Sequence, residues 1–169
     1  MARQIFLNQS LGRRQFKDVL SSLLLVNFLD KDEVWIVSPW ITDFDLIDNS
    51  VNQWNTLAPN FEPRIIRFSE VLISLARAGV HIYIVTRDDP INIPFLSNLK
   101  YQLSGKHELN VCFKQSLHTK GVLSRNAFIE GSLNLTYSGV ESNDESVVLH
   151  TDPQIISNAF LEFKQQYNF

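Results

Sequence analysis

The chain has 169 residues, a formal net charge of −3 and a hydrophobic fraction of 44%. This hydrophobic fraction excludes a disordered chain, and the acidic charge argues against a broad nucleic-acid coating surface, which needs a basic domain. The single cysteine, Cys112, excludes an intramolecular disulfide and a cysteine-rich zinc site. We expect one domain over residues 1–169 in a cytoplasmic protein with no membrane contact, because the longest apolar run, Leu23–Val26, is far shorter than the roughly 20 residues that a membrane span needs.

The first predicted helix begins at Ser10, which can act as an N-cap, and continues to about Leu29, because apolar residues recur there at helical spacing. Three basic side chains, Arg13, Arg14 and Lys17, lie among its polar positions. They form either a solvated basic face near the helix start or a contact with the phosphate backbone of a nucleic acid.

A buried central strand is predicted over Val34–Val37, which is an apolar run of strand-forming residues. The irregular stretch Trp40–Pro63 follows, and loops of this length in a compact domain are usually functional or cover something. Its aspartates, Asp43, Asp45 and Asp48, are either a metal-binding cluster or turn-forming and helix-capping residues.

Helices and strands then alternate. We expect a helix over Phe68–Ala78, ended by Gly79, and a second buried strand over Val80–Thr86. A helix over Ile93–Leu103 and a strand over Leu109–Phe113 come next. This alternation predicts an α/β sandwich with right-handed crossovers and parallel strands at its centre.

The final third of the chain changes to short strands. Leu117–Leu123 alternates in polarity and predicts a strand, and Ala127–Glu130 is its expected partner after a turn at Ser124–Asn126. Another strand is predicted over Ser146–His150, and a closing helix over Pro153–Phe163 with proline at an early helical position.

His118 and Lys120 are the first two candidate site residues. Residues two apart on a strand point the same way and lie about 6.6 Å apart along it, so an imidazole would stand beside a cation. Histidine can attack phosphorus and form a covalent phosphohistidine, and lysine would neutralise charge on the non-bridging oxygens.

Four further residues complete the candidate site. Ser132 and Asn134 follow a predicted strand end and can donate hydrogen bonds to the same phosphate oxygens, while Gly131 lets the backbone approach closely. Glu145 can orient the imidazole through its second nitrogen, as acids do in catalytic triads. The residues from 118 to 145 therefore predict phosphodiester chemistry, provided that the fold brings them together.

These residues resemble the motifs of the phospholipase D superfamily, and most closely those of its small single-motif nuclease branch. The matching motifs are His118-x-Lys120, Gly131-Ser132-x-Asn134 with the continuation Leu135-Thr136, and Asn143-Asp144-Glu145. The resemblance implies a phospholipase-D-like sandwich with a mixed, largely parallel sheet flanked by helices on both faces. It also implies a metal-independent phosphodiesterase that needs no cofactor.

The resemblance has a consequence for assembly, because the mechanism needs a second histidine to protonate the leaving oxygen. Larger members of the superfamily carry two motifs in one chain, whereas this chain carries one. Its other histidines, His81, His107 and His150, lack a lysine two residues further on. We therefore expect a two-fold homodimer in which each chain gives one set of site residues to a shared site.

The sequence departs from the superfamily in one place. The usual motif has an aspartate seven residues after the histidine, and this chain has Arg125 there. In the superfamily that aspartate is regarded as more structural than chemical. Arg125 is therefore either a surface turn residue or a contact with a phosphate, and it leaves the level of activity open.

A second resemblance concerns the whole chain. Trp35–Asp43, Asp48-Asn49, Val85–Arg87 and His118–Gly121 look like the phospholipase-D-like component of bacterial gene clusters that install or police 7-deazaguanine bases in DNA. This resemblance implies work on DNA, in a DNA-modification or phage-defence system, with other defence-system proteins as partners.

Three functions are compatible with these observations. The first is a metal-independent phosphodiesterase with endonuclease activity on DNA. The second is a weakly active or inactive DNA-binding subunit of a larger defence complex, which Arg125 and the acidic net charge favour. The third, lipid hydrolysis or phosphatidyl transfer, has the least support, because no amphipathic membrane-surface helix stands out.

Overall fold

The computed structural model describes residues 1–104 and 109–169, so His107 lies outside the described residues. The helices are α1 (Ser10–Leu25), α2 (Asn27–Asp30), α3 (Phe68–Arg77), α4 (Ile93–Leu103), α5 (Tyr137–Glu141) and α6 (Pro153–Gln166), with a short 3-10 helix η1 (Pro90–Asn92). The strands are β1 (Ala2–Phe6), β2 (Glu33–Val37), β3 (Asp45–Asp48), β4 (Ile65–Arg67), β5 (His81–Thr86), β6 (Leu109–Phe113), β7 (Gly121–Ser124), β8 (Ala127–Gly131) and β9 (Ser146–His150).

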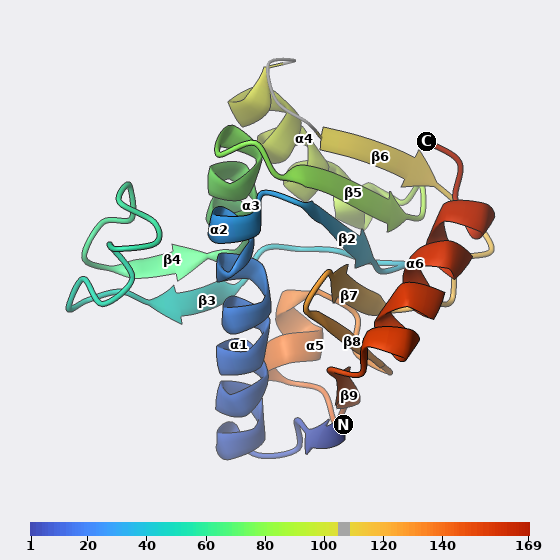
Figure 1. The fold of residues 1–169 in the computed structure, drawn as a ribbon, viewed down its shortest axis with the longest axis horizontal. Coiled ribbons are helices and arrows are strands. Elements are labelled where there is room, and N and C mark those ends of the chain that lie inside the picture. Colours follow the sequence, from blue (N-terminus) through green and yellow to red (C-terminus); the bar gives the residue numbers. More distant parts are fainter. Residues whose placement is uncertain (105–108) are drawn as a thin grey trace.

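One large sheet organises the molecule (Figure 1). Its strands lie in the order β1-β9-β8-β7-β2-β5-β6, and β3 and β4 form a separate two-stranded sheet. β2 pairs in parallel with β5, and β5 with β6, whereas the other neighbours in the large sheet pair antiparallel. Among the described strands of this sheet, β1, β8, β2, β5 and β6 nevertheless run in one direction. The predicted α/β class with a mixed, largely parallel sheet is therefore confirmed in strand direction.

The central strand β2 is buried on both faces, which explains its continuous apolar sequence. Val34 and Ile36 belong to the larger hydrophobic cluster, which packs under α1, α3 and α4. Trp35 and Val37 point the opposite way, into a smaller cluster with side chains of α6. The two clusters alternate along the strand because successive side chains of a strand point to opposite faces.

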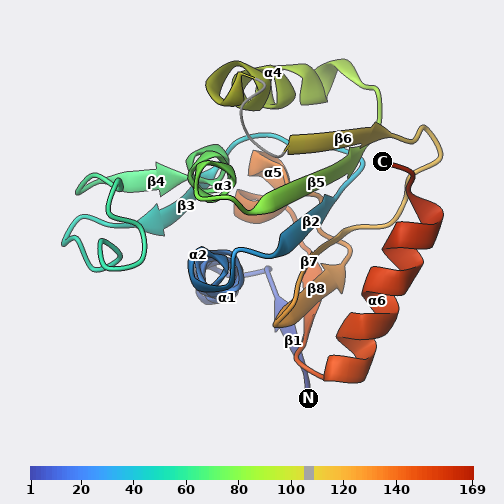
Figure 2. The same cartoon turned by 45° about the horizontal axis from the view of Figure 1, so that its top comes forward.

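Helices accordingly cover both faces of the large sheet, as predicted. Figure 2 shows α1, α2, α3 and α4 on one face, with α6 alone against the other. α6 crosses β7 and β8, the strands that border the candidate site residues. In the described part of the chain no helix is both long and apolar enough to cross a membrane.

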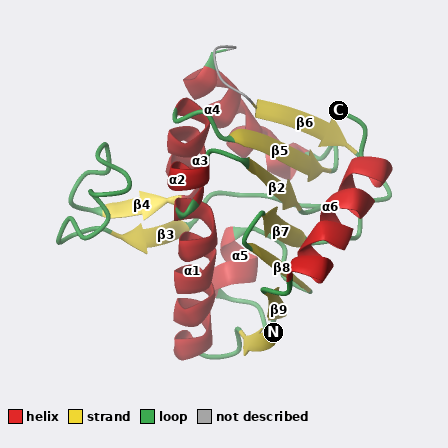
Figure 3. Cartoon of the chain, viewed as in Figure 1, coloured by secondary structure: helices red, strands yellow, loops and turns green. Residues whose placement is uncertain are grey.

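The irregular stretch Trp40–Pro63 contains strand β3, which pairs with β4 in an arm that projects from the main sheet (Figure 3). In Figure 1 this arm lies on the side away from the arrowheads of β5 and β6. Asp43 accepts hydrogen bonds from the backbone N–H (3.0 Å) and hydroxyl (2.7 Å) of Ser69, at the start of α3, and Asp48 accepts one from Ser50 N–H (2.9 Å). The capping and turn-forming interpretation is therefore confirmed for Asp43 and Asp48, whereas Asp45 forms an ion pair with Arg67 at 3.6 Å.

The N-terminal elements differ from the prediction. The helix predicted over Ser10–Leu29 ends at Leu25, a separate turn of helix follows, and Gln9 rather than Ser10 is its N-cap residue. Strand β1 was absent from the prediction, because only Ile5 of its side chains is buried and no apolar alternation marks it.

Candidate functional site

The strand directions collect the candidate residues at one edge of the large sheet. The carboxyl ends of β2, β5 and β8 meet the amino ends of β7 and β9 there, because Val37 pairs with Gly121 and Gly131 pairs with Val147. His118 precedes β7, Ser132 follows β8, and Glu145 precedes β9. The fold therefore brings the three separated motifs to one edge.

The strand predicted over Leu117–Leu123 begins only at Gly121, so His118 and Lys120 lie in the segment that enters it. The expected same-side strand geometry is therefore wrong for this pair. Instead, Lys120 Nζ donates a hydrogen bond to the backbone carbonyl of His118 at 2.9 Å. The His118 side chain is exposed, and its ring has no hydrogen-bond partner among the described residues.

Lys120 and the loop after β8 are neighbours. Gly121 pairs with Glu130, so the chain entering β7 runs beside the chain leaving β8. Lys120, Gly131 and Leu133 line the same small cavity under this edge. The Lys120 side chain is thus next to the backbone of the motif Gly131–Asn134.

Gly131 brings two backbones into contact that any larger residue would separate. A Cβ atom at this position would lie 2.2 Å from the carbonyl oxygen of Ser146. The next residue, Ser132, donates its N–H to that same oxygen at 3.0 Å and accepts a hydrogen bond from Ser146 N–H with its hydroxyl at 3.1 Å. The close approach predicted for this glycine is confirmed.

Glu145 is held by its neighbours within one chain. Its carboxylate accepts hydrogen bonds from the hydroxyl of Ser132 and from Asn143 Nδ2, the latter at 3.4 Å. Its backbone carbonyl accepts a bond from Leu7 N–H at 2.8 Å, which ties it to the end of β1. Among the described residues the carboxylate makes no hydrogen bond to His118, so its predicted role in orienting the imidazole stays a prediction.

Asn134 has unused hydrogen-bonding capacity. Its carboxamide oxygen is buried and has no partner among the described residues. Its backbone carbonyl accepts a hydrogen bond from Thr136 N–H at 2.8 Å, and Gly139 of α5 packs so closely that a Cβ there would lie 2.2 Å from the same oxygen. Unsatisfied buried polar groups are rare, and they are often found at functional sites.

Two basic residues of α1, Arg13 and Lys17, contact the segment Glu141–Asn143, which precedes Glu145. Arg13 Nη2 donates to the carbonyls of Ser142 at 3.3 Å and Asn143 at 3.4 Å, and Lys17 forms an ion pair with Glu141. Arg13 and Lys17 therefore hold the segment that leads to β9 and do not form a freely solvated face. Arg14 is exposed, as the solvated-face interpretation expects.

Sequence reasoning missed two groups that shape the same edge. The hydroxyl of Ser38, directly after β2, accepts a hydrogen bond from Leu135 N–H at 3.1 Å and so fixes the loop that carries Asn134. Arg87, after β5, donates to the backbone that precedes His118. Both lie in segments that carry the second resemblance, and both follow buried strands, whose carboxyl ends ligand sites favour.

Arg125 lies at the other end of β7, in the turn to β8. Its side chain is 71% exposed and forms an ion pair with Asp32 at 3.4 Å. Strand β7 lies between it and His118, which precedes the strand. The surface-turn interpretation is therefore confirmed.

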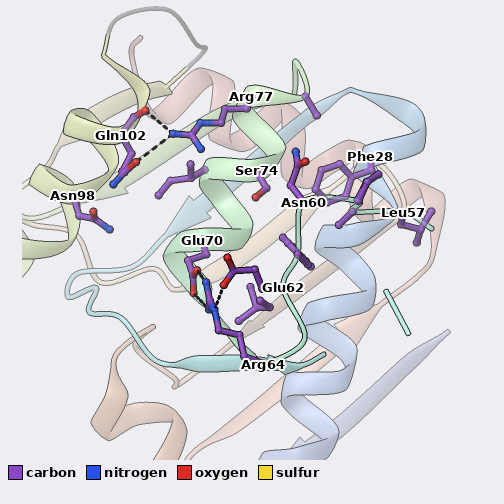
Figure 4. Close-up of a pocket in the computed structure, with 16 residues that line it drawn as sticks. Phe28, Leu57, Asn60, Glu62, Arg64, Glu70, Ser74, Arg77, Asn98 and Gln102 are labelled. Carbon is purple, nitrogen blue, oxygen red and sulfur yellow. Dashed lines mark hydrogen bonds and ion pairs between the residues drawn. The ribbon is translucent and has the colours of Figure 1, made fainter. Parts of the chain in front are cut away.

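The larger cavities lie away from these residues. A pocket of about 580 Å³ opens between the arm, α3 and α4, where Arg64 is bound by Glu62 and Glu70, and Arg77 donates to Gln102 (Figure 4). These carboxylates raise the pKa of Arg64 above its usual value. None of the candidate site residues lines this pocket.

Comparison with known proteins identifies the family. The model of the family described as "Cardiolipin synthase, PLD-like domain" matches residues 29–167. Comparison with the curated proteins gave no significant match.

Solved structures share this fold at low sequence identity. Nuc from Salmonella typhimurium, described as a phospholipase D family member, has a TM-score of 0.61 and 16% identity, over 98% of this chain and 92% of that one. NucT from Helicobacter pylori has a TM-score of 0.58 and 15% identity, over 98% and 95%. TrmBL2, described as an archaeal chromatin protein with a novel mode of DNA binding, has a TM-score of 0.57 and 10% identity, over 99% and 54%. The predicted phospholipase-D-like sandwich is thus confirmed.

Proposed function

Because the chain belongs to the phospholipase D superfamily, we propose that it is a metal-independent phosphodiesterase that cleaves DNA through a phosphohistidine. The observation that carries this proposal is the meeting of His118, Lys120, Ser132, Asn134 and Glu145 at one sheet edge. These residues supply a nucleophile, a cation and hydrogen-bond donors for one phosphate group.

The proposed reaction has two displacements. The His118 imidazole attacks phosphorus, the bond to the leaving oxygen breaks, and a second histidine protonates that oxygen. Water then attacks the phosphohistidine, loses its proton to the second histidine and releases the phosphate monoester. Lys120 and Asn134 would stabilise negative charge on the non-bridging oxygens in both steps.

A homodimer would supply the second histidine. Two exposed apolar side chains support this assembly: Phe6 is 55% exposed and Leu11 is 65% exposed. Leu7 lies between them in the sequence and donates its N–H to the Glu145 carbonyl. Exposed apolar groups that gather at one place usually mark an interaction surface. A two-fold axis at this edge would bring two copies of His118 together.

DNA is the proposed substrate, in a bacterial DNA-modification or phage-defence system with other defence proteins as partners. The resemblance to DpdK, the phospholipase-D-like component of 7-deazaguanine clusters, supports this assignment. The names of two fold relatives are in line with it, since Nuc and NucT carry the name of nucleases and TrmBL2 is described as binding DNA.

The second candidate is a DNA-binding subunit that cuts weakly or not at all, for which the acidic net charge of −3 is the remaining support. Arg125 no longer favours it, because this residue lies in the turn after β7, whereas His118 precedes that strand. Replacing Arg125 with alanine should leave the rate of hydrolysis within about two-fold, because exposed ion pairs contribute little. A large change in rate would give this residue a functional role that the proposal denies it.

The proposal is tested with a generic phosphodiester and with DNA, in the presence of EDTA. Wild type should hydrolyse both, and His118→Ala should lose at least about 10³-fold in kcat, as expected for loss of a nucleophile. His150→Gln is the matched control, because His150 ends β9, whereas the candidate site lies at the start of that strand. Undiminished turnover by His118→Ala, or activity that EDTA abolishes and a divalent ion restores, would contradict the assignment.

A further inference from the structure

Arg87 binds the backbone of the segment that leads to His118 in the candidate active site. Its Nε and Nη2 atoms both donate to the carbonyl oxygen of Leu117, at 3.0 and 2.7 Å. Leu117 is buried under α6 and directly precedes His118. A guanidinium that donates two N–H groups to one oxygen fixes the position of that oxygen far better than a single donor.

Trp40 fixes the guanidinium in turn. The Arg87 Cζ atom lies 4.7 Å from the centroid of the indole ring, within range for a cation–π contact. The indole N–H donates to Asp89 Oδ2 at 3.2 Å, and Asp89 Oδ1 accepts a hydrogen bond from Ile91 N–H at 2.9 Å. The ring is thereby held against the rigid start of η1, and Arg87 has one face covered.

The segment that Arg87 holds lies outside the strands of the sheet. Strand β7 begins only at Gly121, so the residues before it make no ladder hydrogen bonds in the described structure. The backbone is otherwise tied by the bonds from Lys114 N–H to Thr86 at 2.8 Å and from Leu117 N–H to Lys114 at 3.1 Å. Gln115 Nε2 adds a bond to the carbonyl of Asp88 at 3.3 Å, and Arg87 supplies the two shorter side-chain bonds between this segment and the end of β5.

We propose that Arg87, oriented by Trp40, is a positioning residue that fixes the backbone of His118 so that the imidazole stands in line for attack on phosphorus. This inference rests on the proposed function. Because two of its N–H groups are committed to the Leu117 carbonyl, we assign Arg87 to the backbone of the nucleophile and not to the reacting atoms. It acts on the geometry of the nucleophile.

A direct contact between Arg87 and the substrate phosphate would give a different result. Loss of a phosphate contact raises KM and reduces the salt dependence of DNA binding by about one unit of slope. Loss of a positioning residue lowers kcat and leaves KM nearly unchanged, because the ground-state complex forms as before. The two roles are therefore separable by kinetics.

The test compares Arg87→Ala and Trp40→Phe with Arg77→Ala. Arg77 is the matched control, because it also donates to a backbone carbonyl, that of Gln102 at 3.1 Å, but lies at the pocket of Figure 4. We expect Arg87→Ala to lower kcat by roughly 10²-fold, the effect of a misplacement of about 1 Å, with KM within two-fold. Added guanidinium ion should restore part of this loss. Arg77→Ala should keep the wild-type kcat.

Amide hydrogen exchange at Lys114 and Leu117, whose N–H groups donate to the carbonyls of Thr86 and Lys114, provides a readout that needs no activity. Exchange should be faster in Arg87→Ala than in wild type, and unchanged in Arg77→Ala. Unchanged kcat and exchange in Arg87→Ala, or a raised KM with unchanged kcat, would overturn the inference. If wild type hydrolyses nothing, the proposed function fails, and the exchange rates still decide whether Arg87 holds this backbone.

Discussion

The hydroxyl of Ser132 donates a hydrogen bond to the carboxylate of Glu145, and so joins the loop after β8 to the loop before β9. The same two loops are joined by backbone bonds between Ser132 and Ser146. Hydrogen bonds to a carboxylate are stronger than those between neutral groups. Two of the separated motifs are therefore fixed relative to each other before any substrate binds.

Glu145→Gln should lower kcat by roughly 10²-fold, the contribution expected of a group that orients a general acid–base or nucleophilic histidine. The carboxamide has only one acceptor oxygen, so it cannot accept hydrogen bonds from Ser132 and Asn143 at separate oxygens as the carboxylate does. Steady-state kinetics on a generic phosphodiester measure the effect. Asp144→Asn is the control, since Asp144 is exposed beside it. Equal rates for the two variants would remove Glu145 from the site.

Gly131→Ala should disrupt both stability and activity. The new Cβ would lie 2.2 Å from the Ser146 carbonyl oxygen, so the two loops must separate, which we expect to cost about 1–3 kcal/mol of unfolding free energy. Gly79→Ala is the matched control, because Gly79 has a φ of +97° and open space around it. It should cost about 1 kcal/mol without loss of activity per folded molecule. Denaturant unfolding and kcat together check this, and equal activity of the two variants would contradict it.

Leu11→Asp should yield a monomer that lacks activity. A charge in an apolar contact between subunits is costly, and each monomer retains only one His118. Light scattering after size exclusion measures the mass, and Tyr101→Asp, at an 81% exposed position on α4, is the control that should stay dimeric. A monomeric but fully active wild type would show that one chain suffices.

Tyr167 should make stability sensitive to alkaline pH. Burial raises the pKa of its phenol above the usual value near 10. As the pH rises above about 10, the unfolded chain loses this proton before the folded chain does, so the free energy of unfolding falls. The Tm should therefore decrease less between about pH 9 and pH 11 in Tyr167→Phe than in wild type. Parallel curves for the two proteins would contradict this account.

Much of the fold was predictable from local sequence signals. The elements Ile93–Leu103, Leu109–Phe113 and Ser146–His150 have the bounds that their apolar patterns predicted. Strand β1 could not be predicted in this way, because it is an edge strand that pairs only with β9 and is mostly exposed. Its formation depends on a partner that comes 140 to 148 residues later, Ser146–His150.

The site was predictable in its chemistry but less so in its support. Spacing and residue type singled out His118 and Glu145, and the sheet brings their segments to one edge. The role of Arg13 depends on carbonyls about 130 positions away, and that of Arg87 on a carbonyl 30 positions away. Contacts with backbone carbonyls leave no residue-type signal at the partner position, so sequence reasoning did not find them.

The stereochemistry of hydrolysis at phosphorus tests the central claim, nucleophilic attack by His118, most directly. A phosphorothioate diester of one configuration would be hydrolysed in ¹⁸O-labelled water and the product configuration determined. Each displacement inverts phosphorus, so two displacements through a phosphohistidine predict net retention. Net inversion would mean that water attacks the diester directly, and would contradict the account.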